Sequence, residues 1–291
     1  MHTPASVVPQ IALQDSRISA PQIAALAEYS LRLEIETWPK PGLVSHIDAG
    51  SHLDMDARTF YRSASALRPF FAELTEAGER GDPMLTLRKI GLRAEHAMLK
   101  ATGGVNTHRG AIFGLGLLCA AAGVSASGRV DRHLPLGVIV SRRWGRDIMG
   151  GPRLSESHGE VVSRRFGAGG ARCEAARGFP SVYHVGLPAL HSAGSWVPDD
   201  AEAARVQTCF ALIASVEDTN ILHRGGVQGL CFARQTAQSF LSQGGVARSD
   251  WRRRAAAVHL AFVERGLSPG GAADLLTMSL FVMQFNKCQQ R

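Results

Sequence analysis

Several motifs that mark common nucleotide-binding and hydrolase folds are missing from this sequence. It contains no G-x-x-x-x-G-K-[ST], no G-x-G-x-x-G and no G-x-S-x-G, so a P-loop, a Rossmann site or an α/β-hydrolase site is not expected. None of the eleven histidines has the spacing of a zinc protease, which argues against a zinc site. A site of another kind must carry the function.

Paired cysteines and long apolar runs are also lacking. The five cysteines are scattered without a C-x-x-C pair, which is typical of small buried residues in a reducing compartment. The N-terminus has neither a basic nor an apolar stretch of a secretory signal. The longest apolar run, 111–124, contains three glycines and is too short to span a bilayer. We therefore expect a soluble cytoplasmic protein with no membrane partner.

Lysine is scarce, at four residues, although Lys and Arg together outnumber Asp and Glu by 32 to 25. The positive balance favours anionic partners, and arginine suits bidentate phosphate contacts, although a GC-rich gene would give the same excess. One arginine cluster indicates a solvated connection or, alternatively, a polyphosphate or RNA surface. Few aromatic residues lie between its members, Arg142, Arg143, Arg146, Arg153, Arg164, Arg165, Arg172 and Arg177, so stacking on single-stranded RNA is poorly supported and no nucleic-acid partner is expected.

Clean alternation of polar and apolar residues is absent as well, and 138–141 is only a weak strand candidate. Apolar periodicity and helix-start signals instead predict a series of helices. We expect an all-α, single compact multi-helix catalytic domain over 21–291, with functional loops at the helix ends, after a loose N-terminal arm over 1–20. The expected helices begin near residue 21 and otherwise cover about 57–77, 83–100, 111–122, 199–217, 229–241 and 272–286.

The segment 102–116, TGGVNTHRGAIFGLG, joins a flexible polar loop directly to an apolar helix. Unpaired backbone N–H groups and the positive end of the helix dipole would point the same way as Arg109, so this junction predicts a phosphate site. Its second half repeats later in the chain. His108-Arg109-Gly110 and His223-Arg224-Gly225 are each followed by Gly-Leu at the same offset, although an ordinary glycine-punctuated helix start remains an alternative for each copy.

Carboxylates accompany these junctions. Asp54 and Asp56 lie just before the helix expected at residue 57, and with acidic residues elsewhere, Glu34, Glu95, Asp218 and Asp274, they supply enough oxygen ligands for Mg²⁺. Charge complementing a helix start is the alternative for Asp54 and Asp56.

Five loop-to-helix junctions are predicted, at 40–56, 102–110, 170–174, 218–226 and 268–274. If the helices form one bundle, these junctions would gather at one end of it. In the third, Arg172 and Glu174 form a pair that could close over a ligand.

These motifs resemble the triphosphoribosyl-dephospho-CoA synthase family. The similarity covers roughly 25–285 and rests on Glu34, 39–44 (PKPGLV), 50–56 (GSHLDMD), 103–113 (GGVNTHRGAIF), 218–226 (DTNILHRGG) and 268–276 (SPGGAADLL). The resemblance implies an all-helical enzyme that joins ATP to 3′-dephospho-CoA. Adenine leaves, and C1 of the ATP ribose is linked to the 2′-hydroxyl of dephospho-CoA.

The family's product is a prosthetic-group precursor that a separate transferase passes to an acyl carrier protein. The sequence at 43–46 and 50–52 is similar to that of the malonate decarboxylase branch, and the citrate lyase branch is the alternative. Arg109 stands where many relatives carry lysine, which preserves the charge. Two rival functions are compatible with the same residues. The protein could be a metal-dependent N-glycosidic hydrolase, or it could be a helical module that binds polyphosphate or RNA. The number of subunits stays open, and a homo-oligomer is compatible with the sequence.

Roles follow from the resemblance and from the bond that is broken, because loss of adenine builds oxocarbenium character at C1. Glu34, Glu174 and Asp218 are the candidate catalytic residues. Mg²⁺ is expected on Asp54, Asp56 and Asp218. ATP and its phosphates are expected to contact Lys40, Asn106, Thr107, His108, Arg109, Asn220, His223, Arg224, Ser268 and Gly270.

Overall fold

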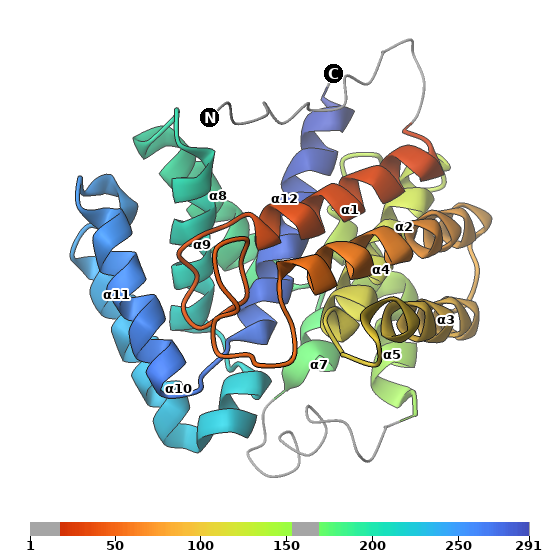
Figure 1. Ribbon diagram of the computed structural model, residues 1–291. Helices are drawn as coiled ribbons and strands as arrows, with labels where there is room; N and C mark the ends of the chain where they lie inside the picture. The colour runs from red at the N-terminus through yellow and green to blue at the C-terminus, as the bar shows by residue number, and fades with distance from the viewer. Residues whose placement is uncertain (1–17, 153–168, 291) are drawn as a thin grey trace, which may run out of the picture.

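The computed structural model describes residues 18–152 and 169–290 (Figure 1). Its described residues form eleven α-helices, one short π-helix and one 3₁₀ turn, and no β-strand. This confirms the prediction of an all-α fold. Of the predicted N-terminal arm, residues 1–17 lie outside the described residues, and its last residue, Ala20, already begins the first helix.

The first described range holds five helices. They are α1 (Ala20–Ile35), α2 (Ala57–Arg80), α3 (Met84–Thr102), α4 (Arg109–Ala126) and α5 (Leu136–Gly150). The second described range holds the remainder, α7 (Gly170–Ala176), η1 (Val182–Gly186), α8 (Leu187–Trp196), α9 (Ala201–Ser215), α10 (Thr219–Ser242), η2 (Gly245–Ala247), α11 (Trp251–Glu264) and α12 (Gly270–Gln289). The helices predicted from periodicity correspond to α1–α4, α9, α10 and α12.

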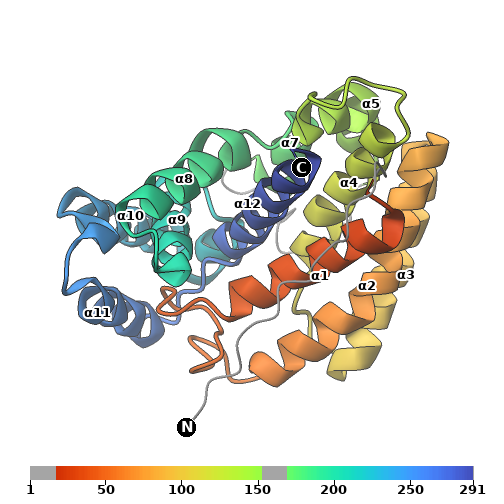
Figure 2. The same cartoon turned by 90° about the horizontal axis from the view of Figure 1, so that it is seen from above.

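Two helices from opposite ends of the chain, α1 and α12, lie between two groups of helices. Figures 1 and 2 show α2, α3, α4 and α5 on one side of this pair and α8, α9, α10 and α11 on the other. Helix α12 contacts its partner α1, helix α4 in the first group, helix α9 in the second, and η1. One hydrophobic cluster runs through both groups, so the helices share a single core.

Helix α4 is the most completely buried of the long helices, and glycines let α2 approach it closely. A Cβ at Gly78 would lie 1.9 Å from the Ala120 carbonyl oxygen, and one at Gly123 would lie 2.0 Å from that of Thr75. Only glycine allows this backbone contact. Among the described helices, α4 alone is long and apolar enough to cross a membrane, but 78% of it is buried inside the protein, as in a core helix.

The predicted strand candidate at 138–141 is wrong, because these residues belong to α5. Ile139 and Val140 are buried together with Trp144 and Ile148, a helical spacing that packs one face against α4. β-Branched residues tolerate a helix when burial compensates their weak propensity. The predicted loose connection over 141–180 is wrong in its described parts for the same reason, since they contain α5 and α7.

The arginines of that connection are partly used inside the fold. Arg143 donates to the Gly81 carbonyl at 2.9 Å, and Arg172 donates to the last carbonyls of α5, at 2.5 Å for Ile148. These contacts satisfy backbone acceptors at chain reversals and helix ends. Three members of the predicted arginine surface, Arg153, Arg164 and Arg165, lie outside the described residues.

Helix α10 begins ten residues earlier than the predicted start at 229. Asp218 caps it by accepting from the amides of Asn220 and Ile221, at 2.8 and 3.2 Å. Gly226 then interrupts the helix with φ 58° and ψ −159°, a conformation suited to glycine. The second His-Arg-Gly therefore lies within a helical turn before a kink, whereas the first opens α4.

Candidate active site

A cavity of about 460 Å³ lies where the ends of α1, α4, α10 and α12 meet the long loop between α1 and α2. This loop reaches across to the second group of helices (Figure 1). The cavity is lined by Glu34, Leu43, Val44, His52, Asp54, Met55, Phe60, Asn106, Thr107, His108, Arg109, Gly110, Asn220, His223, Arg224, Ser268, Gly270, Ala273, Asp274 and Thr277. Four of the five predicted junctions therefore converge on one hollow.

The fifth junction, 170–174, does not contribute to this lining. Its residues form helix α7 instead of a glycine-rich loop. Arg172 is directed to the carbonyls at the end of α5, and Glu174 accepts from the Ser181 amide at 2.7 Å. The prediction that Arg172 and Glu174 close over a ligand as a pair is therefore wrong, and Glu174 is not among the residues that line the cavity.

The first predicted phosphate corner is the start of α4. Asn106 accepts from the Arg109 amide through Oδ1, at 3.2 Å, and so turns the chain into the helix. The Arg109 side chain is exposed at the cavity and forms an ion pair with Glu95. The positive end of α4 and a guanidinium group thus face the same space, as anion binding requires.

The second cationic corner is Arg224, which holds two loops together. It donates to the carbonyls of Ser51 and Gly266, at 3.2 and 3.0 Å, and contacts His52 Nδ1 at 3.3 Å. His52 Nε2 lies 2.8 Å from Ser268 Oγ. Burial, followed by the charge of Arg224, lowers the pKa of His52. Arg224 therefore fixes the α1–α2 loop to the loop before α12.

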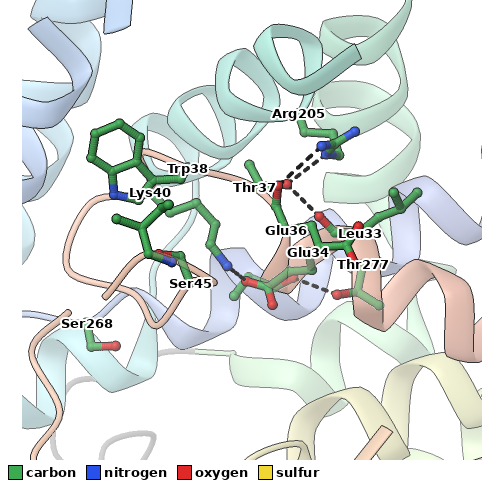
Figure 3. Close-up of polar contacts among 12 residues, drawn as sticks. Leu33, Glu34, Glu36, Thr37, Trp38, Lys40, Ser45, Arg205, Ser268 and Thr277 are labelled. Carbon is green, nitrogen blue, oxygen red and sulfur yellow. Dashed lines mark hydrogen bonds and ion pairs between the residues drawn. The ribbon is translucent and has the colours of Figure 1, made fainter. Parts of the chain in front are cut away.

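Lys40 is fully buried and forms an ion pair with Glu34. Figure 3 shows Lys40 extending from the loop after α1 to Glu34 on the last turn of that helix. Burial raises the pKa of Glu34, and the charge of Lys40 opposes this effect. Glu34 lines the cavity but Lys40 does not. The structure thus gives Lys40 an indirect position, behind Glu34, and not the predicted direct place at the phosphates.

Asp274, which sequence reasoning named only as a possible oxygen ligand, lines the cavity from the second turn of α12. A Cβ at Gly110 would lie 1.9 Å from Asp274 Oδ2. Burial, followed by the charges of Glu34 and Asp218, raises the pKa of Asp274 well above its usual value, although a hydrogen bond from the Ala111 amide works against this. The sequence could have singled out this residue as a candidate, because Asp274 is the single carboxylate in the apolar helix α12.

The predicted Mg²⁺ ligands are not brought together. Asp218 is buried, accepts from Asn220 and Ile221 through Oδ1, and accepts from the Ala272 amide through Oδ2 at 2.9 Å. Asp56 caps α2 by accepting from the amide and hydroxyl of Thr59, both at 2.8 Å.

Neither Asp56 nor Asp218 lines the cavity, whereas Asp54 does. Within the described residues, no group of three or more His, Cys, Asp or Glu is placed to hold a metal ion. The predicted three-carboxylate set is therefore not assembled. For Asp56, the alternative of a helix-start charge is the arrangement observed.

His108 is held by a chain of hydroxyl groups that the sequence did not reveal. Thr107 Oγ1 donates to Ser63 Oγ at 2.8 Å, and Ser63 Oγ lies 2.6 Å from His108 Nδ1. Burial, followed by the charge of Lys40, lowers the pKa of His108 to about 3. His108 is therefore neutral at physiological pH. Ser63 lies in the second turn of α2 without a motif around it, so its role becomes visible only from the packing of α2 on the start of α4.

Comparisons with known proteins agree with this geometry. Residues 20–291 match the family model described as CitG, ATP:dephospho-CoA triphosphoribosyl transferase. A probable 2-(5″-triphosphoribosyl)-3′-dephosphocoenzyme-A synthase of Azotobacter vinelandii is 39% identical over 269 residues, covering 90% of this chain and 91% of the relative. The synthase of that name from Klebsiella pneumoniae is 38% identical over 283 residues, covering 92% of each chain. No solved structure matches.

Proposed function

We propose, from the premise that this chain belongs to the ATP:dephospho-CoA triphosphoribosyl transferase family, that its cavity binds ATP and 3′-dephospho-CoA and transfers the triphosphoribosyl group between them. The chain is a transferase by this family membership. The observation that carries the site assignment is the convergence of Arg109, Arg224 and the start of α4 on one cavity of about 460 Å³. That volume lies within the roughly 300–1,000 Å³ usual for small-molecule sites.

The triphosphate is assigned to the two cationic corners. Arg109 offers a guanidinium group beside the positive end of α4, and Arg224 offers a second one from α10. Asn106, Thr107, Asn220, His223, Ser268 and Gly270 also line the cavity and are proposed to contact the nucleotide. Guanidinium groups bind phosphate oxygens in bidentate fashion, so the polyphosphate is anchored while the ribose reacts.

The chemistry at the ribose is assigned to Glu34 and Asp274. When the C1–N9 bond breaks, its electron pair leaves with adenine, which must take up a proton, and positive charge develops at C1. Asp274 has a raised pKa and is proposed to donate this proton. Glu34, kept close to Lys40, is proposed to stabilise the cation. The C1–O bond then forms with the 2′-oxygen of dephospho-CoA, and the proton of that hydroxyl is proposed to pass to the Asp274 carboxylate, which restores its protonated form.

Mg²⁺ is assigned to Asp54 and the phosphate oxygens. Magnesium is usually bound by one or two carboxylates and completes its shell with water and substrate phosphates. Asp54 lines the cavity and its side chain is 64% exposed, so its oxygens fit this requirement, unlike those of Asp56 and Asp218. When bound, the ion neutralises phosphate charge.

The biological branch is proposed to be the one that serves malonate decarboxylase. The sequence at 43–46 and 50–52 favours the malonate decarboxylase branch, and these residues form part of the loop that reaches the cavity. The product would pass through a separate transferase to an acyl carrier protein. Citrate lyase is the alternative destination, and replacing the native synthase gene in a strain that depends on either enzyme distinguishes them.

The test of the proposed reaction follows free adenine by chromatography when the pure protein is incubated with ATP, Mg²⁺ and 3′-dephospho-CoA. We expect adenine and the coupled nucleotide in equal amounts, and no adenine when dephospho-CoA is omitted. Adenine with free triphosphoribose in the absence of dephospho-CoA would instead identify an N-glycosidic hydrolase. Salt-sensitive binding of random RNA without adenine release would identify a polyanion-binding module.

A further inference from the structure

The ring of His108, a residue that lines the cavity, has one nitrogen with a hydrogen-bond partner in the fold and one without. Nδ1 faces Ser63 Oγ on α2. Nε2 is buried and has no hydrogen-bond partner among the described residues, although His108 lines the cavity and is only 4% exposed. A buried polar nitrogen without a partner is uncommon because it loses its hydration without compensation. Such an atom at a ligand site points to a partner on the ligand.

The hydroxyl chain determines which ring nitrogen carries the proton. A serine hydroxyl has one proton to donate, and Ser63 already accepts from Thr107. Among the described residues, His108 Nδ1 is the other hydrogen-bond partner of Ser63 Oγ, so the Ser63 proton is directed to Nδ1, which acts as the acceptor. In a neutral imidazole the proton must then lie on Nε2. Ser63 and Thr107 thus convert His108 into a fixed N–H donor.

The surroundings match an anion as the acceptor of this N–H group. His108 is the N-cap residue of α4 and directly precedes Arg109, so its ring lies at the positive end of the helix. Phe60 packs edge-on against the ring, with centroids 4.9 Å apart and an angle of 79°. This packing holds the ring in place.

We propose that His108, positioned by Ser63 and Thr107, donates a hydrogen bond from Nε2 as a neutral group to a phosphate oxygen of the bound nucleotide. This inference rests on the proposed function only for the identity of the nucleotide. It makes Ser63 a positioning residue and His108 a binding residue for the polyphosphate. As a neutral donor, His108 would be neither the cation nor the general acid of the site, which agrees with the lowering of its pKa by burial.

The first test does not need turnover. NMR of the protein with ¹⁵N-labelled histidine, with ring signals assigned by their loss in His108→Gln, reports which nitrogen is protonated. We expect the Nε2–H form at every pH between 6 and 8, and a shift of the Nε2–H signal when inorganic triphosphate or ATP is added. A proton on Nδ1, titration within this range, or no response to either probe would overturn the proposal.

The second test separates positioning from simple packing. Ser63→Ala removes the acceptor of Thr107 and the donor to Nδ1, and His108→Phe keeps the ring but removes the donor. We expect each to weaken ATP binding by about tenfold, the effect of losing one hydrogen bond to a charged group, with an unchanged KM for dephospho-CoA. His108→Gln, which retains an N–H donor, should recover part of the loss.

His96→Gln, on an exposed position of α3, is the matched control and should bind ATP as the wild type does. Equal losses for both substrates in His108→Phe would show that the ring only supports the fold. If the variants do not fold, the ring signals of the wild-type protein still decide the question. Absence of adenine release by the wild type would contradict the proposed reaction but would leave the tautomer and triphosphate binding open to the same NMR measurement.

Discussion

The tripeptide His-Arg-Gly occurs twice at the cavity, and its two copies have different structures: all three residues of the first line the cavity, but only the histidine and arginine of the second do. In the first, His108 is buried, Arg109 begins α4 and Gly110 lies against Asp274. In the second, His223 and Arg224 are exposed on the first turns of α10, and Gly225 precedes the kink at Gly226.

This difference shows that the same three residues take their roles from the helix around them. At the start of α4 the backbone itself offers a positive end and the histidine is fixed beneath it. Within α10 the amides are used by the helix, so the arginine side chain supplies the function by bridging Ser51 and Gly266. We expect substitutions at matching positions to have unequal effects.

The largest difference is expected between the glycines. A Cβ at Gly110 would lie 1.9 Å from Asp274 Oδ2, whereas one at Gly225 would lie 2.6 Å from the end of the Leu267 side chain, which can rotate away. Gly110→Ala should displace a buried carboxylate at the reacting centre and lower kcat/KM by about 100-fold or more. Gly225→Ala should cost less than about tenfold. Adenine release measures both, and equal losses would contradict the assigned role of Asp274.

The arginines are expected to differ in the kind of loss. Arg224 joins two loops, so Arg224→Ala should lower the melting temperature and reduce kcat/KM by about 30-fold. Among the described residues, Arg109 has one ion pair, with Glu95, so Arg109→Ala should leave the melting temperature nearly unchanged and raise the KM for ATP by about tenfold. Thermal unfolding and steady-state kinetics separate the two effects. A large loss of stability in Arg109→Ala would contradict this assignment.

The convergence of four loops was predictable because glycines, prolines and charged residues marked the helix ends. The hydrogen-bond partners of the individual carboxylates were not predictable. Asp218 accepts from Ala272, which is 54 positions away, and nothing in the local sequence discloses that contact. Helix α11 was missed because Arg252, Arg253 and Arg254 obscured its buried face, where Trp251, Ala255 and Phe262 recur at helical spacing.

The buried histidine of the first copy, His108, should couple stability to pH. The folded-state pKa of His108 is lowered to about 3 from 6.5, so the fold favours the neutral ring. This contribution is complete above the unfolded-state pKa and is lost as the pH falls from about 6.5 toward 3. Between pH 7 and 5 the wild type should lose about 2 kcal/mol through this residue alone.

His108→Gln removes that loss, so its free energy of unfolding should fall less steeply over this range. Urea denaturation at several pH values measures the slope, and His223→Gln shows what removal of a histidine does at the other copy. A slope for His108→Gln equal to that of the wild type would contradict the neutral state of the ring.

The smallest effect is expected for Arg109→Lys. Lysine keeps the charge at the start of α4 and loses only the bidentate geometry, so the KM for ATP should rise by less than about threefold. The equivalent Arg224→Lys cannot replace both carbonyl contacts and should cost more. Steady-state kinetics of the two variants measured side by side would show whether the copies differ in geometry or only in charge.

One carboxylate, Asp218, closes the start of α10 with one oxygen and the start of α12 with the other. The two helices cannot fray independently, since opening either one leaves a buried negative charge without its amide donors. Amide hydrogen exchange at Ile221 and Ala272 should therefore follow a common opening event. The second arginine corner and the α12 wall that carries Asp274 would then move as one rigid body when substrate enters.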